Sequence, residues 1–110
     1  MRVHEFVLRD VLPSGIQYQD FPRDEMTIIS DEFVLKYHVP FMKVMMHWCN
    51  YGNIQLGLAY HGITILDWNM AQKLKEELLG YCEPSDDLEK LVGVLDRAIN
   101  ERKYVIHFGI

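Results

Sequence analysis

The chain of 110 residues is long enough for one ordinary domain and too short for two. Its composition, with 49% hydrophobic and 12% aromatic residues, supplies a buried core and excludes intrinsic disorder. The formal net charge of −5, with Lys and Arg scattered along the chain, argues against a nucleic-acid partner, because phosphates are neutralised by clustered basic residues. The sequence therefore predicts a single domain over residues 1–110.

The N-terminal segment MRVHEFVLRD lacks the apolar run and the small-residue cleavage site of a secretory signal peptide. No apolar segment approaches the roughly 18 residues that a membrane-spanning helix needs. The two cysteines, Cys49 and Cys82, are then expected to be free thiols of a reducing compartment. We expect a cytoplasmic protein that does not associate with a membrane.

In the first third of the chain the sequence predicts a hairpin and a further strand. The segment RVHEFVL alternates enough for a strand, and the turn signal PSG at 13–15 leads into IQYQDF, which predicts a hairpin across residues 3–19. Residues 20–25 are polar and contain Pro22, so they predict a loop. Residues 33–39, FVLKYHV, are rich in β-branched and aromatic residues and predict a strand that Pro40 ends.

Residues 40–50, PFMKVMMHWCN, favour a helix that is apolar over more than half of its circumference. Methionine is a good helix former and Val44 is the only β-branched residue of the segment. A strand remains the alternative, with Lys43 and His47 facing outward. Its inward-facing residues would be Met42, Val44, Met46 and Trp48.

The second half of the chain predicts a hairpin, two helices and a last strand. NIQLGLAY and ITIL, separated by His61-Gly62, predict the hairpin. Asp67 is the expected N-cap of a helix that Gly80 stops, and Ser85 that of a helix over 86–101. YVIHFGI predicts the strand. Together the elements predict an α+β fold: a mostly antiparallel sheet of five or six strands, with two or three helices packed chiefly on one face.

The residue types of segment 40–50 also raise the question of a soft-metal site. On a helix, Met45 and Cys49 would face the same way, but His47 and Cys49 would lie about 200° apart. No spaced Cys or His pair completes a zinc site. We therefore predict no metal and no cofactor, with the methionines filling core space and Cys49 buried and inert.

An apolar surface is the candidate for function. On the helix after Asp67, Trp68 and Leu79 point to a different edge from the core-facing residues, and Met42 and Met46 belong to the over-wide apolar helix. These four residues are the predicted partner contacts of a non-enzymatic protein-binding module. We expect a homodimer and a regulator or inhibitor, a class that includes phage and mobile-element products.

Two alternatives remain open. The first is a small enzyme or small-molecule-binding protein, with a pocket near His38, His47, His61 and Cys49. The sequence places His38 and His107 at half-exposed strand positions and His61 at the corner of the second hairpin. The second alternative is a structural subunit of a larger complex.

Overall fold

A single six-stranded sheet organises the computed structural model, which describes residues 2–12 and 14–110. The strand order is β2-β1-β6-β5-β3-β4, and every pairing is antiparallel. The strands are β1 (Val3–Arg9), β2 (Thr27–Ser30), β3 (Met45–Trp48), β4 (Ile54–Leu56), β5 (Ile63–Leu66) and β6 (Tyr104–Phe108). The predicted α+β class with an antiparallel sheet is confirmed.

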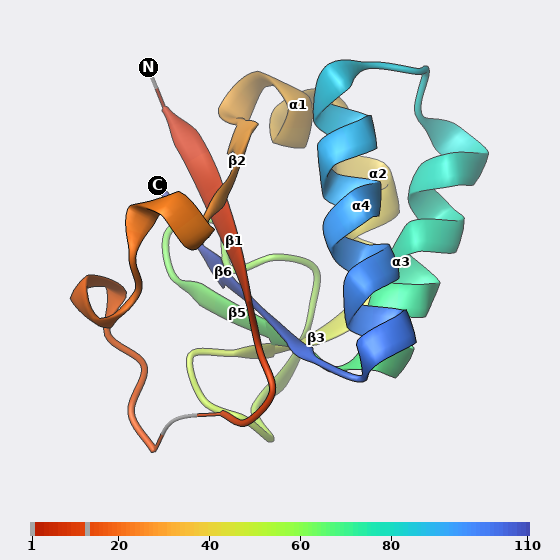
Figure 1. Ribbon diagram of the computed structural model, residues 1–110. Helices are drawn as coiled ribbons and strands as arrows, with labels where there is room; N and C mark the ends of the chain where they lie inside the picture. The colour runs from red at the N-terminus through yellow and green to blue at the C-terminus, as the bar shows by residue number, and fades with distance from the viewer. Residues whose placement is uncertain (1, 13) are drawn as a thin grey trace.

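The helices cover one face of the sheet (Figure 1). They are α1 (Asp31–Lys36), α2 (His38–Phe41), α3 (Trp68–Tyr81) and α4 (Asp86–Glu101). The long helix α4 packs on β2, β1 and β6, whereas α3 packs on β5 and β6. No helix in the described part of the chain is long and apolar enough to cross a membrane.

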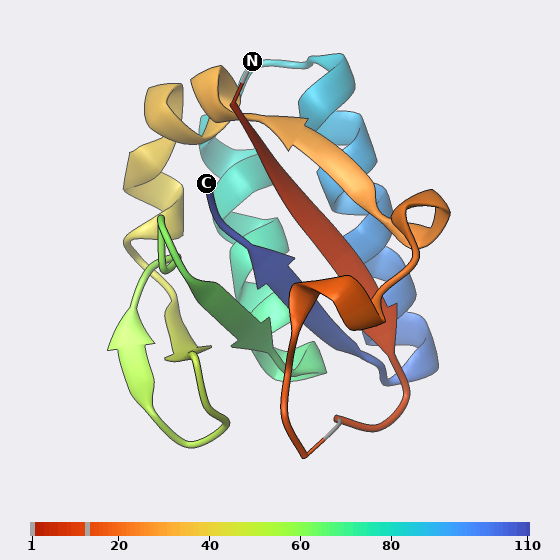
Figure 2. The ribbon, with the colours of Figure 1, turned by 90° about the vertical axis from the view of Figure 1, so that its left-hand side faces the viewer.

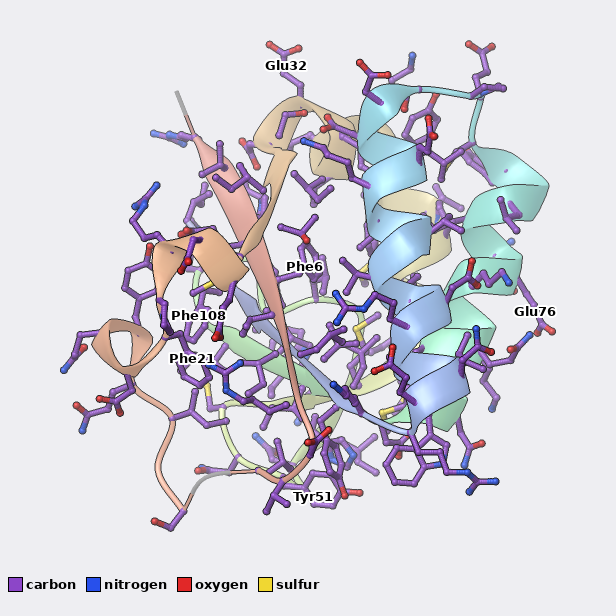
Figure 3. All side chains as sticks on the ribbon, viewed as in Figure 1. Phe6, Phe21, Glu32, Tyr51, Glu76 and Phe108 are labelled. Atoms are coloured by element: carbon purple, nitrogen blue, oxygen red, sulfur yellow. The ribbon has the colours of Figure 1, made fainter. Side chains whose placement is uncertain are left out.

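The part of the opposite face over β1 and β6 is covered by residues 10–12 and 14–26, which contain the short 3₁₀ turns Tyr18–Asp20 and Arg23–Glu25 (Figure 2). The core is accordingly divided by the sheet. Phe6 of β1 lies in the larger cluster between sheet and helices, and Phe21 packs with Phe108 in a smaller cluster under the segment (Figure 3). Both faces of β1 and β6 are therefore buried.

The two long helices begin at the predicted caps. The Asp67 side chain accepts a hydrogen bond from the Met70 amide at 2.8 Å, and the Ser85 hydroxyl accepts one from the Leu88 amide at 3.1 Å. Helix α4 spans the predicted residues, and Arg102 in the left-handed conformation ends it. Helix α3 runs through Gly80, the predicted stop, to Tyr81.

Both predicted hairpins are wrong. β1 pairs with β2 and β6, and the segment after the PSG turn, whose Pro13 lies outside the described residues, forms no strand pairing among those described. Its apolar residues Ile16 and Phe21 pack under the sheet instead. In the second case β4 pairs with β3, and β5 pairs with β3 and β6. Long-range pairing thus overrides the local turn signals.

The predicted strand at 33–39 is also wrong, because this segment is helical in α1 and α2. The Ser30 hydroxyl accepts a hydrogen bond from the Phe33 amide at 3.2 Å and caps α1, and acidic residues occupy the first turn. Phe33, Tyr37 and Phe41 follow at helical spacing and are all buried. The cap and this spacing outweigh the β-propensity of the segment.

The helix favoured for residues 40–50 is wrong as well, since only the end of α2 is helical and Met45–Trp48 form β3. The side chain of Met46 is 0% exposed against the helices, whereas that of Met45 is 48% exposed on the other face. The strand alternative is right in placing Met46 inward. It is wrong for His47, which is buried.

This alternation gives a direct test of β3. Met46→Ala should lower the free energy of unfolding by about 2–5 kcal/mol, because it leaves a cavity in the core. Met45→Ala, one residue away, should change it by less than about 0.5 kcal/mol. Denaturant unfolding of both variants measures the difference, and equal effects would contradict the assigned register.

Candidate functional site

A buried network of polar side chains crosses the centre of the sheet. His4 of β1 and His107 of β6 are both fully buried, and His4 Nδ1 lies 2.8 Å from His107 Nε2. At one end His4 Nε2 lies 3.0 Å from Asp31 Oδ1, and at the other His107 Nδ1 lies 2.9 Å from Thr64 Oγ1. We call Asp31, His4, His107 and Thr64 the histidine network.

The distances in the network fit a chain of hydrogen bonds that runs in one direction. The Ala59 amide donates to Thr64 Oγ1 at 2.9 Å, so the Thr64 hydroxyl is free to donate to His107 Nδ1. His107 Nε2–H then donates to His4 Nδ1, and His4 Nε2–H donates to the Asp31 carboxylate. In this arrangement all four ring nitrogens of His4 and His107 have partners.

The ionisation of the network follows its surroundings. Burial, with a smaller contribution from the neighbouring His4, lowers the pKa of His107 to about 3. The hydrogen bond from the Tyr60 hydroxyl, at 2.6 Å, is the main cause that lowers the pKa of Asp31, against a desolvation effect that raises it. The network therefore holds the Asp31 carboxylate and a neutral His107 ring at neutral pH.

The network resembles a proton relay in its atoms but offers no reacting group to a ligand. Thr64, which would be the hydroxyl at the inner end, is fully buried and already bonded. Only the Asp31 end approaches the surface, at a shallow depression of about 350 Å³ that Arg2, Ser30 and Glu32 also line. The arrangement is that of a structural network.

The four residues of the predicted small-molecule pocket occupy different surroundings. His38 is exposed on α2, and its Nδ1 lies 3.2 Å from the Leu35 carbonyl oxygen. His61 is also exposed, and its Nδ1 lies 3.4 Å from the Ile110 carbonyl oxygen. Cys49 is exposed in the turn after β3, where its φ is 64°. The prediction of a buried Cys49 is therefore wrong.

His47 is the buried member of that set. Its ring stacks on Tyr51 at 4.0 Å, and its Nδ1 accepts a hydrogen bond from the Gly52 amide at 2.8 Å. The proton then lies on Nε2, which has no partner among the described atoms. Burial lowers the pKa of His47. The ring is neutral and packs as part of the sheet.

The half-exposed position that the sequence predicts for His107 is wrong, because the ring is fully buried and packs against His4, Phe6 and Thr64. Sequence reasoning also missed His4 and Asp31 as its partners. The signal in the sequence is the alternation of side chains along β1 and β6, the first and last strands of the chain. It places His4 on the same face as Phe6 and His107 on the same face as Val105, and this face is the one that the helices cover. Within residues 2–12 and 14–110, no three His, Cys, Asp or Glu side chains are grouped as a metal site would require.

The predicted partner contacts separate into two places. Leu79 is exposed on α3, and Trp68 is half-buried against Tyr104, with ring centroids 5.3 Å apart. Met42 is exposed beside the end of β4, where its sulfur lies next to Gly57. Met46 is fully buried and presents no surface. Whether Trp68, Leu79 and Met42 contact a partner stays a prediction.

The most continuous exposed apolar surface surrounds β4. Met45 pairs with Leu56 and His47 with Ile54, so Met45, Leu56 and Ile54 share the sheet face that points away from the helices. We call Met42, Met45, Ile54 and Leu56 the β4 edge surface. Their exposed fractions are 47%, 48%, 47% and 44%.

No family model, no curated protein and no solved structure matches this chain.

The histidine network predicts an acid-sensitive fold. The unfolded chain protonates His107 near pH 6.5, whereas the folded protein does so only near its pKa of about 3, so the unfolded state gains stability as the pH falls below 6.5. From pH 6.5 to 4.5 this residue alone should remove about 2 kcal/mol of stability. The lowered pKa of Asp31 acts below this window, near and under 3.8.

Denaturant unfolding across this pH range measures the effect, and NMR of the imidazole rings identifies its source. The control His38→Asn, at an exposed histidine, should keep the same slope. A His107 ring that titrates near pH 6.5 in the folded protein would contradict the assignment.

The two thiols should differ in reactivity. Cys49 is exposed, whereas Cys82 is partly buried and burial raises its pKa. A chromogenic disulfide reagent at pH 7.5 should therefore modify Cys49 first, and Cys49→Ser should leave only the slower phase. A fast phase that survives this substitution would show that Cys82 is the accessible thiol.

Proposed function

We propose that the protein is a non-enzymatic protein-binding module that pairs with a second copy of itself through the β4 edge surface. The observation that carries the proposal is the open edge of β4. This strand pairs only with β3 in the described structure, and it bears no charged side chain. Charges, especially Lys, are the usual protection of an edge against further pairing.

The opposite edge of the sheet is protected. On β2 the carbonyl of Ile28 accepts a hydrogen bond from Lys90 Nζ at 2.7 Å, and α4 packs along the strand. A partner strand would have to displace this lysine. The contrast between the two edges favours β4 as the place of contact.

The backbone of β4 suits pairing with itself. The Trp48 amide donates to the Asn53 carbonyl and the Gly57 amide donates to the Val44 carbonyl, so residues 53 and 57 face β3. By alternation, the amides and carbonyls of Ile54 and Leu56 face the open edge. In an antiparallel pair about a two-fold axis at Gln55, Ile54 lies opposite Leu56 of the second copy, and each pair exchanges two hydrogen bonds.

The side chains support the same arrangement. Ile54, Leu56 and Met45 of both copies would lie on one continuous sheet face and exclude water from each other. Because the strand is uncharged, no like charges oppose one another across the axis. A sheet extended across two protomers is the expected product.

The test is the mass of the protein in solution. Sedimentation at about 50 μM should give a dimer for the unmodified chain. Ile54→Pro should give a folded monomer, because proline removes an amide that faces the open edge and is tolerated there. Leu56→Lys, which introduces the missing edge charge, should have the same effect.

Two controls locate the contact. Leu35→Lys, at an equally apolar and exposed position on α1, should remain dimeric. Leu79→Asp should also remain dimeric. A monomeric unmodified protein, or a dimer that Leu79→Asp dissociates and Ile54→Pro does not, would overturn the proposal.

A further inference from the structure

A second surface, on the outer side of the helical layer, has a different character. Helices α3 and α4 run side by side, joined by the short connection of residues 82–85 (Figure 1). A groove of about 840 Å³ lies along the outward side of α4, bounded by Leu79 near the end of α3 and by Pro84 and Ser85 of the connection. Its apolar lining includes Leu79, which is exposed, Val92, which is half-buried, and Leu88, which is buried. Its carboxylates are Asp86, Glu89 and Asp96.

We infer that this groove binds a basic amphipathic helix of a different protein. The inference does not depend on self-pairing at β4, because the groove faces away from the sheet. Two antiparallel helices with an exposed apolar seam are a usual docking place for a third helix. The groove extends along α4 from Ser85 to Asp96, a length of roughly 16 Å, which matches about three turns of a bound helix.

The charges of the groove select a basic partner. No basic side chain is among its described lining residues. Asp96 is neutralised by Lys75 at 2.5 Å, but Asp86 and Glu89 form no ion pair with any described residue. Lys90 lines a neighbouring depression together with Asp86 and Glu89, but its Nζ is directed to Asp87 and to the carbonyl of Ile28. Asp86 and Glu89 lie in the first turn of α4, where negative side chains also stabilise the helix.

Gly93 supports the choice of a closely packed helix. It lies in the middle of α4, where glycine lowers helix stability relative to alanine, and it lines the groove. A Cβ atom added to Gly93 would meet nothing within 4 Å. The protein itself therefore does not need the space, and an incoming helix could approach the α4 backbone there.

The probe is a synthetic peptide of about 14 residues with leucines at i, i+3, i+4 and i+7 and lysines flanking that stripe. Two matched peptides serve as controls: one with the same composition in scrambled order, and one with glutamate in place of lysine. Fluorescence anisotropy measures affinity, and NMR of the labelled protein locates the contact. We expect the basic amphipathic peptide to bind at least about tenfold more tightly than either control.

Three variants connect binding to the groove. Gly93→Trp should fill the groove without disturbing the fold and weaken binding about tenfold or more, and Leu79→Asp should do the same. Asp86→Asn with Glu89→Gln should weaken binding a few-fold at low salt and less at high salt. Lys73→Trp, at an exposed position of α3 outside the groove lining, is the matched control and should bind as the unmodified protein does.

Each outcome of the peptide experiment either supports or overturns the inference. Tight binding that Gly93→Trp and Leu79→Asp abolish, with NMR shifts confined to α3 and α4, supports the inference. Equal binding of the glutamate peptide, unchanged affinity of both groove variants, or no binding at low salt would overturn it. Circular dichroism and the melting temperature establish that each variant is folded, and the peptide readout is independent of whether the protein is a dimer.

Discussion

The contact between His4 and His107 is the constraint on which the sheet depends. Neither ring reaches water, so each nitrogen needs a partner, and an unpaired buried polar group costs about 1–3 kcal/mol. The partners come from β5 through Thr64 and from the start of α1 through Asp31. A slip of β6 by one residue would turn His107 to the other face and break the network. Four elements are therefore held in one register.

The long range of this contact separates the parts of the fold that could be predicted from the sequence from those that could not. Helices α3 and α4 carry local signals, the caps Asp67 and Ser85 followed by an apolar stripe, and these suffice without any long-range contact. The strand predicted for segment 33–39 is wrong because the prediction gave more weight to the β-branched and aromatic residues than to the helix cap at Ser30. The network itself joins residues 103 positions apart, so no local pattern contains it. The groove is equally nonlocal, since it exists only once α3 and α4 lie side by side.

The exposed surfaces follow from what the helical layer covers. Helix α4 packs on β2, β1 and β6, and α3 packs on β5 and β6. The segment of residues 10–26 covers the other face near β1 and β6. β4 and the outward face of β3 lie beyond both covers, and therefore Met45, Ile54 and Leu56 remain exposed although Met46, next to Met45 on β3, is buried. A six-stranded sheet is wider than its two long helices, and the excess appears at one edge.

Charge then gives the two surfaces different partners. The middle of the chain, residues 36–66, contains no acidic residue, and β3 and β4 come from it, so their edge can meet an identical edge without repulsion. Three acids of the last third, Asp86, Glu89 and Asp96, line the groove, and no basic residue is among its described lining residues. Two such grooves would repel each other, whereas a lysine-rich helix would be attracted. An uncharged edge therefore fits a second copy of this chain, and an acidic groove fits a basic partner of another kind.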